Sequence, residues 1–247
     1  LPIILLTIAV IACQSKTDSK DAQATKPNIL FILADDCTNW DLGAYGSPDA
    51  ITPNIDRLAA EGMKFTRCYQ AAPMCSPTRH NIFTGLYPVK TGAYPNHTFA
   101  KEGTKSIVQY LKPLGYRVAL SGKRHIKPET IFDFEFLGKD KNPEFDLIDE
   151  FLADAKSKNE PFALMLTSNE PHNPWNMGDP SIFNPDSLTL PPFFPDTRVI
   201  REEYAKYLAE INYLDSQVGT ALELLEKHGF AENTLVMFAS EQGAIWP

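Results

Sequence analysis

The sequence predicts an α/β fold, in which a mainly parallel sheet has helices on both faces. Short apolar runs with β-branched and aromatic members alternate with longer helical patterns, and such runs are typical of strands buried on both faces. This alternation is the pattern of parallel sheets with crossover helices. The chain has 247 residues and is 43% hydrophobic, enough for one sizeable core, so a single folded domain is expected.

The expected strands are apolar runs bounded by polar or turn-forming residues, at 28–34, 117–121, 162–167 and 234–239. The last of them is expected to be buried like the others. The first helix starts at Pro53, with Thr52 as its N-cap, and Ile55, Leu58, Ala59 and Met63 on one face. Further helices are expected at 77–84, 105–114, 146–156 and 202–227, and the Pro-rich segment 173–196 is expected to run over the site.

Each expected strand is followed by polar or ionisable residues. Ligands collect at the carboxyl ends of the strands in sheets of this kind. Four separate strand exits that all carry such groups are hard to explain by chance. These groups are Asp35 and Asp36 after the first strand, Lys123 and His125 after the second, His172 after the third, and Glu241 and Gln242 after the last.

The charge balance is acidic, with 23 Lys and Arg against 31 Asp and Glu and a net charge of −8. This balance argues against sequence-independent binding of nucleic acid. An anionic substrate stays open, because a few local cations and a metal ion set the electric field inside a pocket.

The first twelve residues, LPIILLTIAVIA, are apolar apart from Thr7. A membrane-spanning helix needs about 20 residues, so this run instead resembles the apolar core of an export signal, over 1–13. Val10 to Cys13 resembles a bacterial lipobox, whose cysteine is lipidated, and 14–26 is then a polar tether. We expect an exported lipoprotein, periplasmic or at the cell surface, that meets the membrane only through its lipid anchor. A plain secretory signal is the alternative. Because residue 1 is Leu, the sequence is expected to be truncated at its start.

Two further cysteines, Cys37 and Cys68, have no chemistry assigned to them. A disulfide between them in an oxidising compartment and two unpaired, half-buried thiols both stay open. Sequence alone does not show whether the two lie close in space.

The most informative motif is Cys75-Ser76-Pro77-Thr78-Arg79, which matches C-x-P-x-R. Alone it is moderately specific, but it follows Asp35-Asp36 and precedes GKRH at 122–125 and PHNP at 171–174. In this order, over nearly all of 26–247, the motifs resemble those of the type I, formylglycine-dependent sulfatases of the alkaline-phosphatase-like superfamily. Within that family, 122–136 (GKRHIKPETIFDFEF) is most similar to heparan N-sulfatase, the sulfamidase.

The resemblance implies that a formylglycine-generating enzyme oxidises Cys75 to formylglycine, whose hydrated aldehyde is the nucleophile. One hydroxyl attacks sulfur and the other later expels sulfate, so covalent catalysis divides one hard step into two easier ones. Pro77 suits the first turn of a helix, which places Cys75 near the positive end of the helix dipole. Arg79 then holds the diol with a fixed charge. The alternatives are a small buried hydrophobe for Cys75 and a surface ion pair for Arg79.

The resemblance also implies roles for a lysine and two histidines, and a third histidine is assigned a role from its position in the loop after the active-site helix. Lys123 neutralises a sulfate oxygen, and His125 takes the proton from the diol hydroxyl that drives sulfate release. If the chain is extended here, these two side chains point to the same side. His172 is a sulfate contact and the acid for the leaving group, and His97 lines the substrate pocket. The alternative for Lys123 and His125 is a K-x-H motif on the surface. For His172 it is a loop histidine that caps a carbonyl, and for His97 it is a loop position without function.

Asp35, Asp36, Glu241 and Gln242 offer three carboxylates and an amide oxygen, and the family adds residue 75 to this metal site. Adjacent carboxylates at a buried strand end repel unless a cation lies between them, although a lone Asp-Asp pair is more often a helix cap or a solvated turn. Hard oxygen ligands favour Ca²⁺ or Mg²⁺, and the family usually binds one Ca²⁺. Where the family usually has Asp and then Asn or His, Glu241 and Gln242 are one methylene longer and keep a ligating oxygen.

The sequence therefore predicts a sulfatase that hydrolyses sulfate esters or N-sulfates of sulfated sugars or glycosaminoglycans. One alternative is a phosphoryl or phosphonate monoester hydrolase of the same superfamily. Another is a catalytically dead homologue that binds sulfated glycan, which the altered pair at 241–242 favours. The family has a later active-site lysine and a smaller C-terminal subdomain, so 27–247 is expected to be a truncated N-terminal catalytic domain.

Overall fold

A computed structural model describes residues 26–244, and the expected export signal, the lipobox and nearly all of the tether lie outside these residues. Among the described residues, five strands form one sheet in the order β3-β2-β4-β1-β5, and every pairing in it is parallel. The strands are β1 (Asn28–Ala34), β2 (Arg117–Gly122), β3 (Glu135–Leu137), β4 (Phe162–Thr167) and β5 (Thr234–Ser240).

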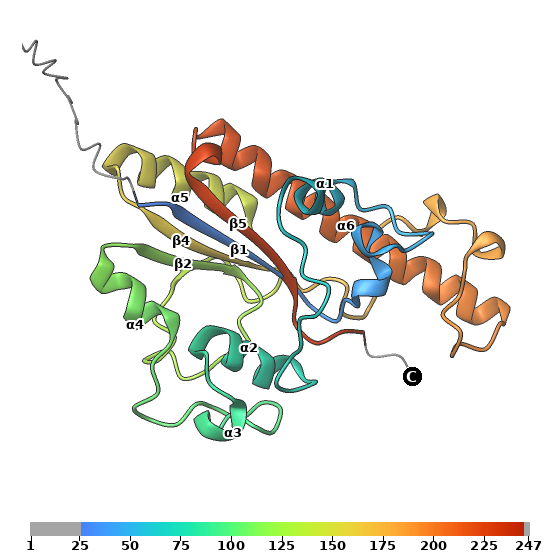
Figure 1. The fold of residues 1–247 in the computed structure, drawn as a ribbon, viewed down its shortest axis with the longest axis horizontal. Coiled ribbons are helices and arrows are strands. Elements are labelled where there is room, and N and C mark those ends of the chain that lie inside the picture. Colours follow the sequence, from blue (N-terminus) through green and yellow to red (C-terminus); the bar gives the residue numbers. More distant parts are fainter. Residues whose placement is uncertain (1–25, 245–247) are drawn as a thin grey trace, which may run out of the picture.

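Helices cover both faces of this sheet, as the sequence predicts (Figure 1). α5 and α6 pack on one face, and α2 and α4 pack on the other. The α-helices are α1 (Pro53–Glu61), α2 (Cys75–Thr84), α3 (Pro88–Thr91), α4 (Ile107–Leu111), α5 (Phe145–Lys158) and α6 (Arg198–Lys227). Short 3-10 helices occupy Asn39–Asp41, Gly43–Tyr45, Lys112–Leu114, Pro180–Ile182, Pro185–Ser187 and Ala231–Asn233.

Strand β1 contributes to two separate hydrophobic cores. Its side chains alternate between the two faces of the sheet, as they do in any strand. Leu30 and Ile32 belong to the core under α5 and α6, whereas Ile29 and Phe31 pack against the core under α2 and α4. Because both faces are covered by helices, a strand in the interior of this sheet must be apolar at every position.

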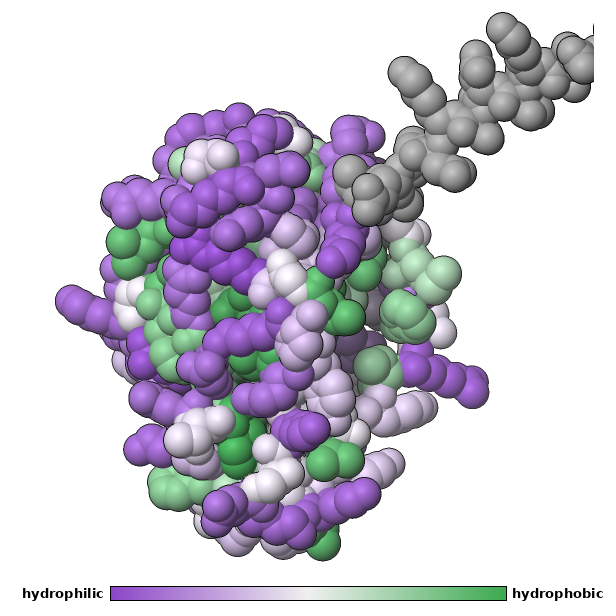
Figure 2. Space-filling view, turned by 90° about the vertical axis from the view of Figure 1, so that its left-hand side faces the viewer, coloured by the Kyte–Doolittle hydropathy of each residue, from purple (hydrophilic) through white to green (hydrophobic). Residues whose placement is uncertain are grey.

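Backbone pairing continues one residue past the strands and brings the polar strand exits together. Asp35 N–H donates to the carbonyl of Glu170 at 3.0 Å, and Lys123 N–H donates to that of Thr167 at 2.8 Å. Gly122 makes this approach possible, because its φ is +104° and a Cβ there would lie 1.9 Å from the Thr167 carbonyl oxygen. The face at the opposite, amino ends of the strands carries mostly hydrophilic side chains with hydrophobic ones between them (Figure 2).

The expected strands 28–34 and 162–167 are confirmed, and the other two are each one residue longer than predicted. The prediction that the last strand is buried is wrong. Among the described residues β5 is an edge strand, where Leu235 is 53% exposed and Met237 is 38% exposed. β3 was not expected, because a three-residue strand that begins with Glu135 contains no apolar run.

The helices are placed correctly, but several boundaries and one face differ from the prediction. α2 begins at Cys75 itself, two residues before the expected start, and α6 begins at Arg198. α1 ends at Glu61, so Met63 lies beyond it and is 79% exposed. Ile55 is buried and Leu58 and Ala59 are half-buried, so the predicted apolar face fails only at Met63.

The segment 173–196 was expected to run over the site, but most of its length does not cover the site. Its first residues line a cavity beside Asp36, and the remainder packs along α6. Gly178 lies directly against this helix, since a Cβ there would be 2.1 Å from the carbonyl oxygen of Ala209. The segment therefore contributes one wall to the site.

Cys37 and Cys68 are both free, so the alternative without a disulfide holds. Cys37 is buried and Cys68 is exposed, rather than both being half-buried. In the part of the chain that the structure describes, no helix combines the length and the apolar character needed to cross a membrane.

The N-terminus of α1 is capped by a side chain from α6. Thr52 holds the N-cap position, but its hydroxyl donates to Asp56 and accepts from the amide of Gly43 instead of capping the helix. Asp215 Oδ1 accepts from the backbone amides of Asn54 at 3.0 Å and Ile55 at 2.8 Å. This carboxylate takes the place of a local cap and ties α1 to α6.

We expect Asp215→Ala to lower the free energy of unfolding of the full-length protein by about 2–3 kcal/mol, because it leaves two helix-terminal amides without their charged acceptor. Urea denaturation measures the change. Glu223→Ala, at an exposed position of the same helix, is the matched control. A loss no greater than that of the control would show that Asp215 does not cap α1.

Candidate active site

Four buried ligand groups meet at the carboxyl edge of the sheet. Asp35 and Asp36 follow β1, Cys75 opens α2, and Glu241 follows β5. One ligand atom from each lies within 4.8 Å of the corresponding atom of every other. The structure thus brings together four of the five residues that the sequence predicts as metal ligands.

Cys75 occupies the first helical position of α2, after Met74 as the N-cap residue. The backbone amides of the first helical turn and the helix dipole favour an anion here. The thiol itself is a poor nucleophile, because burial and the carboxylates of Glu241 and Asp35 raise its pKa to about 12. A thiol in this setting stays protonated at neutral pH.

Arg79 lies one turn further along α2 and is fully buried. Its Nε lies 2.6 Å from Oε2 of Glu241, close enough for an ion pair although the two are not aligned for a hydrogen bond. Its Nη1 donates to the carbonyl of Lys123 at 2.7 Å, and its Nη2 lies 3.9 Å from Asp35. The alternative of a surface ion pair is therefore wrong: Arg79 is an internal charge that links α2 to the ends of β2 and β5.

Lys123 directs its ammonium group at the carboxylate of Asp35, with which it forms an ion pair. Its side chain is only 13% exposed. Burial by itself raises the pKa of Asp35, but the interactions with Glu241, Arg79 and Lys123 together lower that pKa below its usual value. Asp35 is thus the carboxylate in the cluster that stays ionised most readily.

The charges of the cluster suit a divalent cation. When Asp35, Asp36 and Glu241 are ionised, the fixed charges of Arg79 and Lys123 leave one negative charge uncompensated. Oδ1 of Asp35 and Oε1 of Glu241 are buried without a hydrogen-bond partner. Buried carboxylate oxygens of this kind are costly unless they bind a proton or a cation. The donor set, oxygen-rich and dense, fits a hard cation such as Ca²⁺.

Gln242, the fifth predicted ligand, presents its Nε2 to the cluster. This nitrogen donates to Oδ1 of Asp36 and lies 3.4 Å from Sγ of Cys75, while Oε1 is buried without a partner. A half-turn of the amide exchanges the two atoms and directs the oxygen at the cluster. The side chain is therefore in place for the expected role, with the opposite end of its amide facing inward.

Two carboxyl groups of this cluster hold their protons more tightly than usual. Burial and the carboxylate of Asp35 raise the pKa of Glu241 to about 8, despite the opposing charge of Arg79. Burial and the charge of Asp35 also raise the pKa of Asp36. A cation that binds here must displace a proton.

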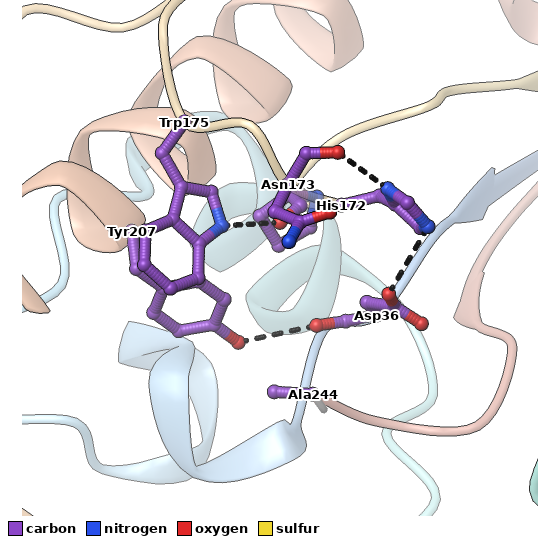
Figure 3. Close-up of a pocket in the computed structure, with 7 residues that line it drawn as sticks. Asp36, His172, Asn173, Trp175, Tyr207 and Ala244 are labelled. Atoms are coloured by element: carbon purple, nitrogen blue, oxygen red, sulfur yellow. Dashed lines mark hydrogen bonds and ion pairs between the residues drawn. The ribbon is translucent and has the colours of Figure 1, made fainter. Parts of the chain in front are cut away.

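His172 lies on the wall of a cavity of about 100 Å³ beside Asp36 (Figure 3). Its Nε2 is 3.7 Å from Oδ2 of Asp36, and its Nδ1 donates to the carbonyl of Asn173 at 2.6 Å. Because a carbonyl oxygen only accepts, Nδ1 carries a proton. Trp175 and Tyr207 close the other side of this cavity.

His125 and His97 form a pair, with Nε2 of His125 2.8 Å from Nδ1 of His97. His125 has a φ of +49°, so the chain is not extended there, and the condition under which Lys123 and His125 were expected to point to the same side is not met. Lys123 and His125 nevertheless lie close to each other. Burial is the largest cause that lowers the pKa of His125 to about 4, and the charge of Lys123 is the second largest. His97, expected to line the substrate pocket, is exposed and contacts His125.

One group that positions Asp36, the hydroxyl of Tyr207, was not predicted from the sequence. The hydroxyl of Tyr207 donates to the backbone carbonyl of Asp36 at 3.3 Å, and it also contacts Asp41 at 3.0 Å. Asp36 has a φ of +58°, a conformation that needs such support. The signal in the sequence was weak, because Tyr207 lies on a helix 171 residues away from Asp36.

A cysteine at a helix N-terminus thus lies beside a carboxylate cluster, a fully buried arginine and a largely buried lysine. The chain belongs to the sulfatase family, whose family model matches residues 27–245. The fold is the alkaline-phosphatase-like fold of the sulfatases.

Among curated proteins, an ulvan-active sulfatase from Formosa agariphila is 32% identical over 241 residues, which cover 93% of this chain and 47% of that protein. Human N-sulphoglucosamine sulphohydrolase is 26% identical over 262 residues, 91% of this chain and 52% of that protein. The chain thus spans about half the length of the curated relatives that it matches.

Solved structures show the same fold. A protein solved in complex with its substrate, D-glucosamine-2-N,6-O-disulfate, matches with a TM-score of 0.72 at 22% identity, covering 88% of this chain and 66% of that one. The phosphonate monoester hydrolase of Agrobacterium radiobacter matches with a TM-score of 0.67 at 20% identity, covering 90% and 64%.

We expect Ca²⁺ affinity to rise as the pH is raised from about 6 to about 8. Glu241 has its pKa raised to about 8, so at lower pH it still holds the proton that the cation must displace. One displaced proton weakens the apparent affinity by up to about tenfold per pH unit below that pKa. Calorimetric titration of the full-length protein measures this dependence. Glu241→Gln should weaken binding and flatten the slope; affinity that does not vary with pH would contradict the assignment.

Proposed function

We propose that the protein is a sulfatase that uses a formylglycine derived from Cys75 and one divalent cation, Ca²⁺. The observation that carries this proposal is the position of Cys75, at the first turn of α2, within 4.8 Å of the carboxylate ligands. A hydrated formylglycine at this position would supply the nucleophile, and Asp35, Asp36 and Glu241 would hold a divalent cation that supplies Lewis-acid chemistry for a sulfate oxygen.

The chain's own residues prepare this site for an anion. Arg79 and Lys123 contribute two positive charges, and the amides at the N-terminus of α2 add a partial one. With a divalent cation in place, the cluster carries a net positive charge, which suits a sulfate ester or N-sulfate. Arg79 is held between Glu241 and the carbonyl of Lys123, so its positive charge is fixed at this edge of the sheet and needs no reorganisation.

The protonated state of Cys75 supports the need for its conversion. A thiol whose pKa is raised to about 12 has almost no thiolate at neutral pH. Direct attack by this sulfur on a sulfate ester is therefore disfavoured, whereas a diol hydroxyl does not depend on the same ionisation. A formylglycine-generating enzyme is the partner that this proposal requires.

The proposed substrates are sulfated sugars or glycosaminoglycan units. The names of the curated relatives support this class, since one acts on ulvan and the other is an N-sulphoglucosamine sulphohydrolase. A phosphonate or phosphate monoester is the second candidate, because it is also a tetrahedral anion and the fold is shared with a phosphonate monoester hydrolase. Comparison of kcat/KM for matched sulfate and phosphonate esters separates the two.

The first test is conversion and loss of function at position 75. When the full-length protein is coexpressed with a formylglycine-generating enzyme, mass spectrometry should find the peptide that contains residue 75 as the aldehyde or its hydrate. Cys75→Ala should abolish release of sulfate, because the proposed nucleophile is formed from the side chain of this residue.

Cys68→Ala is the matched control, because Cys68 is an exposed free cysteine outside the site. It should leave turnover unchanged. Full activity of Cys75→Ala would end the sulfatase proposal. Binding of sulfated glycan by a converted protein without any turnover would instead support the catalytically dead homologue.

A second test concerns His172 as the acid for the leaving group. An alkoxide leaving from a sugar needs a proton, whereas an activated aryl oxide needs it much less. His172→Ala should therefore slow a sugar sulfate by about 10²–10⁴-fold and a nitrophenyl sulfate far less. Steady-state kinetics on both substrates measure the difference. Equal losses on the two substrates would refute this role for His172.

A further inference from the structure

The charges of this protein are divided very unevenly along its sequence. Residues 62–132 contain 11 Lys and Arg but only two acidic residues, Glu102 and Glu129, so this segment has a net charge of +9. The rest of the chain, with 12 basic and 29 acidic residues, has a net charge of −17. The protein thus combines a cationic part with a strongly acidic remainder, and a local cationic surface attracts anions even on an acidic protein.

The cationic segment lies beside the candidate site. It contains α2, α3, α4 and β2, and α3 contacts α2 and lies outside it, away from the sheet (Figure 1). Four of its basic residues already have acidic partners: Arg79 and Lys123 in the site, Lys112 with Asp133, and Arg117 with two carboxylates. Exposed cations of the segment that have no such partner are available to a ligand.

Three exposed lysines of the segment, Lys90, Lys101 and Lys127, form no ion pair with any residue of 26–244. They lie on adjoining stretches of the chain. The amide of Lys101 donates to the carbonyl of Thr91, the neighbour of Lys90, at 2.8 Å. The amide of Ala100 donates to the carbonyl of Lys127 at 3.1 Å. Backbone hydrogen bonds therefore hold the three lysines on one part of the surface.

Two exposed aromatic rings lie in the same region. Tyr94 is 63% exposed and Phe99 is 54% exposed. The ammonium group of Lys127 lies 5.2 Å from the centre of the Phe99 ring, an attractive contact that does not neutralise its charge. We call Lys90, Lys101, Lys127, Tyr94 and Phe99 the cationic ledge.

The cationic ledge is continuous with the candidate site. Its loop reaches the first turn of α2, where the amide of Ser76 donates to Oδ1 of Asn96 at 3.4 Å. A second connection joins α2 to the ledge, since Nε2 of His80 lies 3.0 Å from the carbonyl of Lys127. The ledge therefore adjoins the helix that begins at Cys75. A ligand that occupies the site and is longer than one sugar has this surface beside it.

We propose that the cationic ledge binds a sulfated glycan beyond its reacting sugar, so that the protein prefers a chain with several sulfate groups to a single sulfated sugar. The lysine ammonium groups face further sulfates, and the exposed rings face the apolar sides of sugar rings. The reacting sulfate rests on the proposed function, whereas binding to the ledge needs no turnover. Such binding weakens with salt, because exposed charges are screened.

The first test is calorimetric binding of heparin and ulvan hexasaccharides to the full-length protein, with Cys75→Ala present to prevent turnover. At least one hexasaccharide should bind about tenfold more tightly than N-sulfoglucosamine, and more weakly as NaCl rises from about 50 to about 200 mM. The triple variant Lys90→Gln, Lys101→Gln and Lys127→Gln should lose about tenfold in affinity for that hexasaccharide and depend less on salt, while its affinity for N-sulfoglucosamine stays within about twofold.

The matched control is the triple variant Lys156→Gln, Lys158→Gln and Lys227→Gln. These exposed lysines end the helices that precede β4 and β5, so they make the same change in charge at the opposite edge of the sheet. This control should keep its affinity for the hexasaccharide within about twofold. Equal losses in the two triple variants would refute a role for the ledge. Equally tight binding of single-stranded DNA with the same number of charges would refute a site for sulfated glycan.

Lysine acetylation followed by mass spectrometry tests the location of binding directly. In the free full-length protein, Lys90, Lys101 and Lys127 should react with acetic anhydride, and the bound hexasaccharide should protect them. Lys156 should react to the same extent in both states. If the three ledge lysines are unreactive in the free protein, another part of the chain covers them and the proposal is wrong.

These outcomes separate the inference from the proposed function. If the converted full-length protein hydrolyses no sulfate or N-sulfate but binds a hexasaccharide through the ledge lysines, the function fails and the inference stands. If it releases sulfate and the ledge variant binds both hexasaccharides as tightly as the protein with all its lysines, the function stands and the inference is refuted.

Discussion

The structure depends on the placement of several buried charges at one edge of a parallel sheet. Three carboxylates, from Asp35, Asp36 and Glu241, converge there, and Arg79 and Lys123 neutralise two of them. Isolated buried charges are costly, so each carboxylate needs a partner within the fold. This requirement explains why Arg79 is fully buried.

The sequence was sufficient to predict the fold wherever local pattern and burial agree. β1 and β4 lie in the interior of the sheet, so their apolar runs are complete and their bounds were predicted to the residue. β5 has an equally apolar run, but nothing in a run of residues distinguishes an edge strand from an interior one. The cap of α1 could not be predicted either, because Asp215 is 161 residues from Asn54 and Thr52 offers a plausible local alternative.

In the candidate site, the positions of the side chains could be predicted from the sequence, but their orientations could not. Strand exits were sufficient to predict which residues meet, because parallel strands place all their carboxyl ends together. They could not predict the direction in which each group points. A single positive φ at His125 turns its ring to His97, and a single amide orientation at Gln242 directs a nitrogen rather than an oxygen at Asp36.

The unusual pair at 241–242 can be understood in these terms. The extra methylene of Glu241 has not removed its carboxylate from the cluster: Oε2 reaches Arg79 while Oε1 is buried and free to bind a cation. The change therefore keeps the charge of the ligand set, which argues against loss of the metal as the reason for the substitution. Gln242 adds an oxygen only when its amide turns, and a cation favours that turn because it repels the NH₂ group and attracts the carbonyl dipole. The metal and the amide orientation are thus coupled, and the electrostatics of the cluster, rather than the side-chain lengths, decide whether the site is complete.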